Sequence, residues 1–427
     1  MTAQPDRPIS AFPEYTKTDT DSDGPLAGVK IVDFSHFVAG PFCTMVLGDM
    51  GAEIIKIEAA KGDDIRAFPP NDPFLDGQGS PFLWANRNKK SIVLNLKSKE
   101  GIAVVHDLVK SADVVVENFS TGVMERLGLS YDDLKKVNDK LIYCSISAYG
   151  RTGAFADRMG FDTVVQAESG FMSFNGYPDR DGIRVQPVVM DTSTALMASN
   201  AIIAALFKRE RGGTGQRIDV SLYETSLNML GYGAMQYLMN GIEPSRVGNS
   251  SNDTAPTALF HTSDSAFFVS SSNTVIFQRI FHVIGRPDVA EDPGLQDRKG
   301  RLERRDEMFD ILQEAFGKET WSYWEEKLRE ANVPAGEMRT LPEAFHSDVT
   351  RESGIVSRIP HPTAGEIPNI ALPIRFSETP IVDPVAAPLI GQHTREILQE
   401  NLGYDAEQIA ALEASGGLGT FKISKND

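Results

Sequence analysis

Short apolar runs alternate with longer amphipathic stretches through the first half of the chain. Six of the runs have the length and the β-branched residues typical of buried strands. They are residues 30–34 (KIVDF), 53–58 (EIIKIE), 91–96 (SIVLNL), 113–116 (DVVV), 141–147 (LIYCSIS) and 217–220 (RIDV). Stretches with helical spacing of apolar residues separate them, among them 42–50, 99–111 and 192–211. This alternation predicts βαβ units around a parallel sheet, so the expected fold class is α/β with a Rossmann-like large domain.

The pattern changes near residue 245. A second long helix is expected over 221–239, followed by an Asn- and Ser-rich stretch, a hairpin pattern over 258–270 and three helical patterns. Beyond residue 341 the chain is Pro-rich and is expected to be extended, ending in one helix over 394–402. The predicted organisation is a flexible tail (1–24), the first part of the large domain (25–225), a linker helix and loop (226–255), a small α+β domain (256–340) and a Pro-rich crossover that returns to the large domain (341–427).

The charge balance excludes some classes of partner. Among 427 residues, 59 are acidic and 42 are basic, which gives a net charge of −17. A nucleic-acid binder or a polybasic membrane anchor carries the opposite excess, so neither class is expected. No apolar run of about 20 residues and no signal-peptide pattern is evident in the sequence. We therefore expect no membrane association and a cytoplasmic location.

Motifs that the sequence lacks exclude further classes of protein. The two cysteines, Cys43 and Cys144, cannot form a disulfide framework, and no metal-ligand spacing occurs, so no metal site is predicted. The segment after the first strand has a single glycine, Gly40, before the next helix, whereas dinucleotide binding requires a Gly-rich turn there. The P-loop and the nucleophile-elbow patterns are also missing.

Asp191 is the first candidate for chemistry. It follows the apolar run 188–190 and opens the strongest predicted helix. One interpretation is an N-cap, in which the side chain accepts hydrogen bonds from the first helical N–H groups. The other is a nucleophile, which the same N–H groups would hold ionised for attack on an activated acyl carbon. The residue pattern alone leaves both open.

A series of sequence blocks then points to a family. They are PLAGVKIVDFSHFVAGPFC from residue 25, NRNKKSIVLNL from 86, DVVVENFSTGVMERLG from 113, ISAYGRTG from 146, GFDTVVQAESG from 160, MDTSTALMAS from 190, NVPAGEM from 332 and PLIGQHTREIL from 388. In this order and spacing, from about residue 26 to 402, the chain resembles the class III CoA-transferase family. That family includes formyl-CoA, carnitine and bile-acid CoA-transferases.

The resemblance implies an activity and a mechanism. Asp191 matches the family's catalytic aspartate, which attacks an acyl-CoA thioester and forms first an aspartyl anhydride and then an aspartyl-CoA thioester. An acceptor carboxylic acid then takes up the CoA. CoA thioesters would be substrates, and no permanently bound cofactor is expected. The resemblance also implies an interlocked, ring-like homodimer.

The same resemblance implies a CoA site. The positions that match the family's CoA-binding residues are His36, Val38, Ala39, Leu94, Asn118, Phe119 and Arg126. Arg66 is a further candidate partner for a phosphate, because a guanidinium pairs well with phosphate oxygens. The turn from Val38 to Pro41 is a candidate source of N–H groups for an oxyanion.

Some positions depart from the family pattern. Oxalate-using members carry a Gln where this chain has Val38, a lysine at Ser147, and a run of glycines in the small domain where this chain has only Gly248. The acceptor is therefore expected to be a larger acid, such as a C4 or C5 dicarboxylate. Arg158 or Arg184 is the candidate clamp for its distal carboxylate. Transfer between two carboxyls of one molecule stays open.

The fold implied by this resemblance is compatible with two other functions. The racemase branch of the same fold, typified by α-methylacyl-CoA racemase, carries a His in a GHD motif, and this chain has GFD with Phe161 and Asp162. Phenylalanine cannot transfer a proton, so racemisation is the lesser interpretation. A non-catalytic CoA-binding protein of the same fold would be expected to have lost Asp191.

Overall fold

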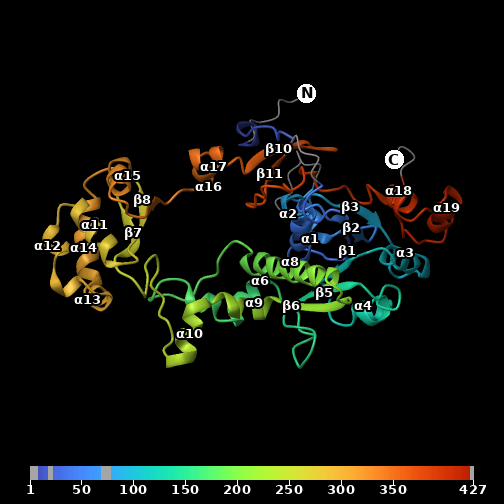
Figure 1. Ribbon diagram of the computed structural model, residues 1–427, viewed down its shortest axis with the longest axis horizontal. Helices are drawn as coiled ribbons and strands as arrows, with labels where there is room; N and C mark the ends of the chain where they lie inside the picture. The colour runs from blue at the N-terminus through green and yellow to red at the C-terminus, as the bar shows by residue number, and fades with distance from the viewer. Residues whose placement is uncertain (1–7, 18–22, 69–77, 424–427) are drawn as a thin grey trace. The chain divides into compact units, whose positions relative to one another are not determined.

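The computed structural model describes residues 8–17, 23–68 and 78–423 (Figure 1). The chain forms two compact units. The first consists of the described residues in 1–169, 186–229 and 349–427, and the second of 170–185 and 230–348. The second unit therefore takes in residues 170–185, which the sequence assigned to the large domain, and the return to the first unit begins at residue 349 rather than 341.

A six-stranded parallel sheet forms the centre of the first unit. Its strands are β1 (Lys30–Asp33), β2 (Glu53–Glu58), β3 (Lys90–Val93), β4 (Val114–Glu117), β5 (Ile142–Ser147) and β6 (Gln216–Ser221). Their order is β3-β2-β1-β4-β5-β6, and Ile31 of β1 pairs with Ile54 of β2 on one side and Val114 of β4 on the other. The predicted Rossmann-like α/β fold is confirmed. The strand order reverses between β1 and β4, where ligands bind in such sheets.

Helices cover both faces of this sheet because its strands bury side chains on both sides. Their bounds are α1 (Ala39–Asp49), α2 (Ser80–Ala85), α3 (Lys99–Val109), α4 (Val123–Leu127), α5 (Tyr131–Leu134), α6 (Asp162–Glu168), α8 (Val189–Glu210) and α9 (Leu222–Met229), with a 3-10 turn η2 (Asp64–Ala67). On one face Val32, Val115 and Val105 share a core with Leu412 from the end of the chain. On the other face α1 packs against α8.

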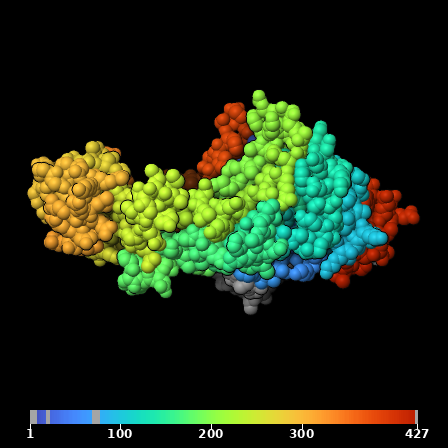
Figure 2. All heavy atoms as spheres, turned by 90° about the horizontal axis from the view of Figure 1, so that it is seen from below, coloured from blue at the N-terminus to red at the C-terminus, as the bar shows by residue number. Residues whose placement is uncertain are grey.

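The C-terminal segment contains more structure than expected. It begins with α17 (Asp348–Ser353) and the antiparallel hairpin β10 (Val356–His361) and β11 (Gly365–Ile370). Pro360 and Pro368 fit into this ribbon because each strand of a two-stranded ribbon has one edge that needs no N–H donor. The expected helix at 394–402 is α18 (Thr394–Glu396) followed by a π-helical turn η5 (Ile397–Asn401), and α19 (Ala406–Ala414) follows it. Figures 1 and 2 show this segment, in red, beside the N-terminal half of the first unit.

The expected N-terminal tail is partly ordered. Residues 1–7 and 18–22 lie outside the described residues. In the described part, a short turn η1 (Pro8–Ala11) leads to Tyr15, whose N–H donates to the Arg358 carbonyl at 2.8 Å. Arg358 Nε in turn donates to the Phe12 carbonyl at 2.7 Å. These contacts attach residues 8–17 to β10, so this stretch is not loose.

α8 corrects one expectation from the sequence. By length and composition it is a candidate membrane-crossing helix, although no such stretch was expected. Its buried face includes Ala195, Ala198, Ile202 and Leu206, and it packs against α1, β5 and β6. Packing inside the first unit therefore accounts for the apolar residues of this face, whereas Leu196, Met197 and Phe207 of the same helix are exposed.

The second unit is a small α+β domain, as predicted. Its antiparallel sheet has β7 (Thr257–His261), β8 (Ala266–Ser270) and β9 (Ala335–Glu337). Its helices are α7 (Phe171–Phe174), α10 (Gly231–Asn240), α11 (Thr274–Val283), α12 (Pro287–Ala290), η4 (Pro293–Leu295), α13 (Arg298–Glu303), α14 (Arg305–Phe316), α15 (Trp321–Glu330) and α16 (Leu341–Phe345). The expected helix over 221–239 is divided into α9 and α10 at Gly231, whose φ of +58° lies in the left-handed region.

Candidate active site

A cavity of about 1700 Å³ opens at the carboxyl ends of the strands in the first unit, and we call it the switch-point cavity. The loops after β1, β4 and β5 contribute His36, Asn118 and Ala148 to its wall, and the last residue of β5, Ser147, lies beside them. The first turn of α8 adds Asp191, and the C-terminal segment adds Gly419. The cavity lies where the strand order reverses, which is the expected ligand site of a doubly wound sheet.

Asp191 presents an unengaged carboxylate to this cavity. It lies in the first turn of α8, is half-buried, and accepts no hydrogen bond from any described residue. Burial raises the pKa of Asp191 to about 7, and the nearby negative charge of Asp162 adds to the rise. The expectation that helix N–H groups hold this carboxylate fully ionised is therefore wrong near neutral pH.

Asp162 takes the capping role that the sequence offered to Asp191. The N-cap position of α8 is Val188, which has no side-chain cap. The Oδ2 atom of Asp162 accepts hydrogen bonds from the N–H of Met190 at 2.7 Å and of Asp191 at 3.4 Å. Its Oδ1 atom accepts from Gln166 Nε2 at 2.6 Å. Because Asp162 satisfies the amides of the first turn, the Asp191 side chain has no capping function.

Asn118 fixes the loop that carries His36. Its Oδ1 accepts from the His36 N–H at 2.8 Å, and its Nδ2 donates to the His36 carbonyl at 2.8 Å. The Phe119 ring lies 5.2 Å from the His36 ring. Arg151, which sequence reasoning left out, donates to the Phe119 carbonyl at 2.6 Å and pairs with Glu117 at 3.0 Å. The loops after β1 and β4 are therefore held together at the cavity wall.

The structure brings most of the predicted site residues together. The residues that line the switch-point cavity are His36, Val38, Ala39, Leu94, Asn118, Phe119 and Asp191. Arg126 lies on α4, is exposed, and does not line it. Arg66 does not line it either: its guanidinium pairs with Glu58 at 2.6 Å, donates to the Pro388 carbonyl at 2.9 Å and stacks on Phe82 at 3.7 Å.

Sequence reasoning also missed cations at the cavity wall. Lys61 and Lys97 are exposed and line the cavity, and Lys61 pairs with Asp64 at 2.7 Å. Lys97 makes no ion pair with any described residue. An exposed lysine of this kind is a suitable partner for a phosphate. No group of three or more His, Cys, Asp or Glu side chains suited to a metal ion occurs in residues 8–17, 23–68 and 78–423.

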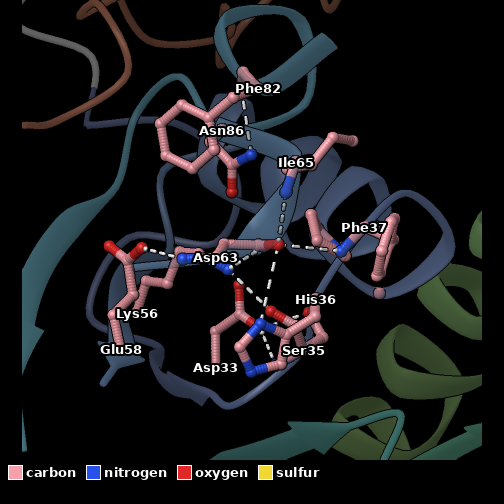
Figure 3. A network of polar contacts seen from close by, with 12 residues as sticks. Asp33, Ser35, His36, Phe37, Lys56, Glu58, Asp63, Ile65, Phe82 and Asn86 are labelled. Carbon is pink, nitrogen blue, oxygen red and sulfur yellow. Dashed lines mark hydrogen bonds and ion pairs between the residues drawn. The ribbon is translucent and has the colours of Figure 1, made fainter. Parts of the chain in front are cut away.

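A buried ionic network lies under the loop after β1 (Figure 3). Lys56 Nζ, fully buried, donates to the Ser35 carbonyl at 2.6 Å and to Asp63 Oδ2 at 3.1 Å. Lys89 pairs with Asp33 at 3.0 Å, and the pKa of Asp33 is about 2 because Lys89 and Lys56 outweigh the effect of burial. The signal in the sequence is the presence of charged residues within otherwise apolar strand patterns (KIVDF and EIIKIE). The strand pattern does not reveal which of these charges are paired.

Comparison with known proteins agrees with this fold. Residues 26–394 match the model of the family described as CoA-transferase family III. A mouse protein named succinyl-CoA:glutarate CoA-transferase is 36% identical, over 94% of this chain and 92% of its own. An acetyl-CoA:oxalate CoA-transferase of Acetobacter aceti is 37% identical over 77% of this chain and 84% of its own. The crystal structure of a CaiB/BaiF family protein from Brucella suis superposes with a TM-score of 0.79 at 33% identity, covering 89% of this chain and 99% of that one.

Proposed function

Because the chain belongs to CoA-transferase family III, we propose that it moves CoA from an acyl-CoA to a dicarboxylic acid of four or five carbons, with Asp191 as the residue that is transiently acylated. The observation that carries this proposal is the Asp191 carboxylate, which faces the switch-point cavity without a hydrogen-bond partner in the described chain. The ionised form of this side chain, whose population grows as the pH rises through about 7, can attack an acyl carbon.

The proposed reaction exchanges one thioester for another. A carboxylate oxygen of Asp191 attacks the thioester carbonyl carbon, the C–S bond breaks, and CoA thiolate leaves behind an aspartyl–acyl anhydride. The thiolate then attacks the aspartyl Cγ and releases the donor acid, which gives an aspartyl-CoA thioester. The acceptor carboxylate attacks the same Cγ and displaces the thiolate. Finally the thiolate attacks the acceptor's acyl carbon, which forms the new acyl-CoA and restores Asp191.

The start of α1 supplies donors for the oxyanions in these steps. Ala39 and Gly40 lie in the first turn of α1, where an α-helix leaves its N–H groups without intrahelical partners. Ala39 lines the switch-point cavity. Fixed N–H groups of this kind stabilise the tetrahedral intermediates that form when a thioester or an anhydride is attacked. Pro41 follows directly and has no N–H to offer.

The lining of the cavity supports a dicarboxylate acceptor larger than oxalate. Val38 is apolar where oxalate-using enzymes of the family are expected to have a Gln. Arg158 lines the cavity, stacks on Tyr149 at 4.9 Å and pairs with the exposed Glu168, so a substrate carboxylate can replace Glu168 as its partner. The name of the mouse relative, which refers to succinyl-CoA and glutarate, is consistent with such an acid. Racemisation lacks support because the cavity carries Phe161 in place of a proton-transferring residue.

Trapping the acylated enzyme tests this proposal. The protein is incubated with succinyl-CoA and quenched with hydroxylamine, which converts an aspartyl anhydride or thioester to a hydroxamate. Peptide mass spectrometry is expected to locate the hydroxamate on Asp191. Asp219→Asn, which changes an exposed carboxylate on β6, is expected to label normally, and Asp191→Asn is expected not to label. A hydroxamate at another residue, or none in a folded enzyme that turns over, would contradict the proposal. Glutarate and oxalate offered as acceptors then identify the preferred acid.

A further inference from the structure

Asp63 lies just behind the cavity wall and contacts the loop that carries His36. Its Oδ1 atom accepts from the Phe37 N–H at 3.3 Å and from the Ile65 N–H at 3.2 Å. The same Oδ1 lies 3.6 Å from His36 Nδ1. Asp63 itself does not line the switch-point cavity, whereas His36 does. Figure 3 shows Asp63 between Lys56 and His36 in this network.

Asp63 is held in its charged form. Burial alone would raise the pKa of Asp63, but the positive charge of Lys56 and the contact with His36 together lower it well below its usual range. An ionised carboxylate accepts hydrogen bonds and donates none. The negative charge of Asp63 therefore faces His36 Nδ1. The 3.6 Å between the two atoms is too long for a good hydrogen bond, but the charge still attracts a proton on Nδ1. Asp63 thus favours the form of His36 that carries a proton on Nδ1.

The opposite ring nitrogen is then the one available to a ligand. His36 Nε2 makes no hydrogen bond or ion pair with the described residues, while the backbone of His36 is held on both sides by Asn118. The backbone of His36 is thus fixed, and its ring is oriented by the Nδ1 contact with Asp63 and by the Phe119 ring 5.2 Å away. A side chain restrained in this way presents one defined atom to a substrate.

We propose that Asp63 is a positioning residue for the transfer reaction: it holds the His36 ring with Nδ1 toward itself, so that Nε2 contacts the CoA portion of the substrate in the switch-point cavity. This inference rests on the proposed function, because it assumes that CoA binds in this cavity. In this arrangement Asp63 acts only through His36 and touches no substrate atom.

A double-mutant cycle measured by calorimetric titration with CoA tests the proposal. Asp63→Asn is expected to raise the dissociation constant of CoA by about tenfold, since the loss of one charge-assisted contact costs about 1.4 kcal/mol or more. In a His36→Ala background, the same Asp63 change is expected to cost nothing further, because the residue through which it acts is gone. Histidine ¹⁵N NMR of Asp63→Asn is expected to show a changed protonation pattern of the His36 ring.

Asp113→Asn is the matched control. Asp113 also accepts a backbone N–H, from Lys30 at 2.7 Å, and pairs with a cation, Arg209, at 2.7 Å, but it lies away from the cavity. CoA affinity is expected to be unchanged in this variant. If Asp63→Asn fails to fold, the double variant Lys56→Met/Asp63→Asn removes both buried charges together and takes its place.

The outcomes separate this inference from the proposed function. Equal CoA affinity in the wild type and Asp63→Asn, or additive losses for Asp63 and His36, would overturn the positioning role and leave the transfer reaction standing. A wild-type protein that does not bind CoA would instead reject the proposed function. An unchanged His36 spectrum in Asp63→Asn would also overturn the inference.

Discussion

Asp191→Asn is expected to stabilise the first unit while abolishing acyl transfer. The pKa of Asp191 rises from the ordinary 3.8 to about 7, first because of burial and then because of Asp162. At about 1.4 kcal/mol per pKa unit, this difference disfavours the folded state by roughly 4 kcal/mol above pH 7. Because the folded pKa is the higher one, the penalty is absent below pH 3.8, grows as the pH rises, and is complete above pH 7. An asparagine never ionises and avoids it.

The assay follows from this pH dependence. Wild type and Asp191→Asn are unfolded in urea at pH 5 and at pH 8, and hydrogen exchange of α8 peptides reports the opening of the first unit alone. The stability advantage of Asp191→Asn is expected to increase by roughly 3 kcal/mol between the two pH values, which corresponds to two pKa units.

Asp113→Asn serves as the control, because this change removes the contacts of a carboxylate with Arg209 and the Lys30 N–H and not an unpaired carboxylate at the cavity wall. An advantage for Asp191→Asn that is the same at pH 5 and pH 8 would refute the reasoning. It would mean that the folded-state pKa of Asp191 is close to its ordinary value and that desolvation at the cavity wall is slight.

Two further substitutions test the electrostatics of Asp191 and the packing at the start of α1. Asp162→Asn keeps the hydrogen-bond acceptor for the first turn of α8 but removes the charge, so the pKa of Asp191 is expected to fall toward its ordinary value. When the rate of hydroxamate formation is measured as a function of pH, the increase in rate is then expected at a lower pH than in the wild type. An unchanged pH profile would mean that Asp162 does not raise the pKa of Asp191. Gly40→Ala places a Cβ 2.2 Å from Ser35 Cβ and is expected to cost about 2 kcal/mol of stability by overpacking. Gly336→Ala, where the added Cβ meets nothing within 4 Å, is the comparison, and equal melting temperatures for the two variants would contradict the packing argument.

The sequence predicted the sheet well because each strand carries its own signal. Runs of four to seven apolar and β-branched residues bounded by turns define a buried strand with little help from the rest of the chain. The hairpin β10–β11 lacked such a signal, since Pro360 and Pro368 normally interrupt strands. These prolines are compatible with strands here only because β10 and β11 form a two-stranded ribbon, in which each strand has an open edge that needs no N–H donor.

The parts of the site that depend on long-range contacts could not be predicted. Arg66 follows a Gly-Asp-Asp turn and has the chemistry of a phosphate ligand, but its partners Glu58 and the Pro388 carbonyl come from a strand and from a distant segment. The hydrogen bonds of Asp162 to the start of α8 likewise join residues 28 and 29 positions apart. No local pattern reveals that this aspartate, and not Asp191, satisfies the first amides of α8.

The wall of the switch-point cavity unites residues from both ends of the sequence, and this has a consequence for biosynthesis. A chain synthesised only through the second unit contains every strand of the large sheet but lacks Gly419 and Thr420. It also lacks the Gly417 carbonyl, which accepts from the Asn95 N–H at 2.7 Å in the finished fold, and Leu412, which completes the core on one face of the sheet. Closure of that core and completion of the cavity wall therefore both wait until residues 412–420 have been synthesised.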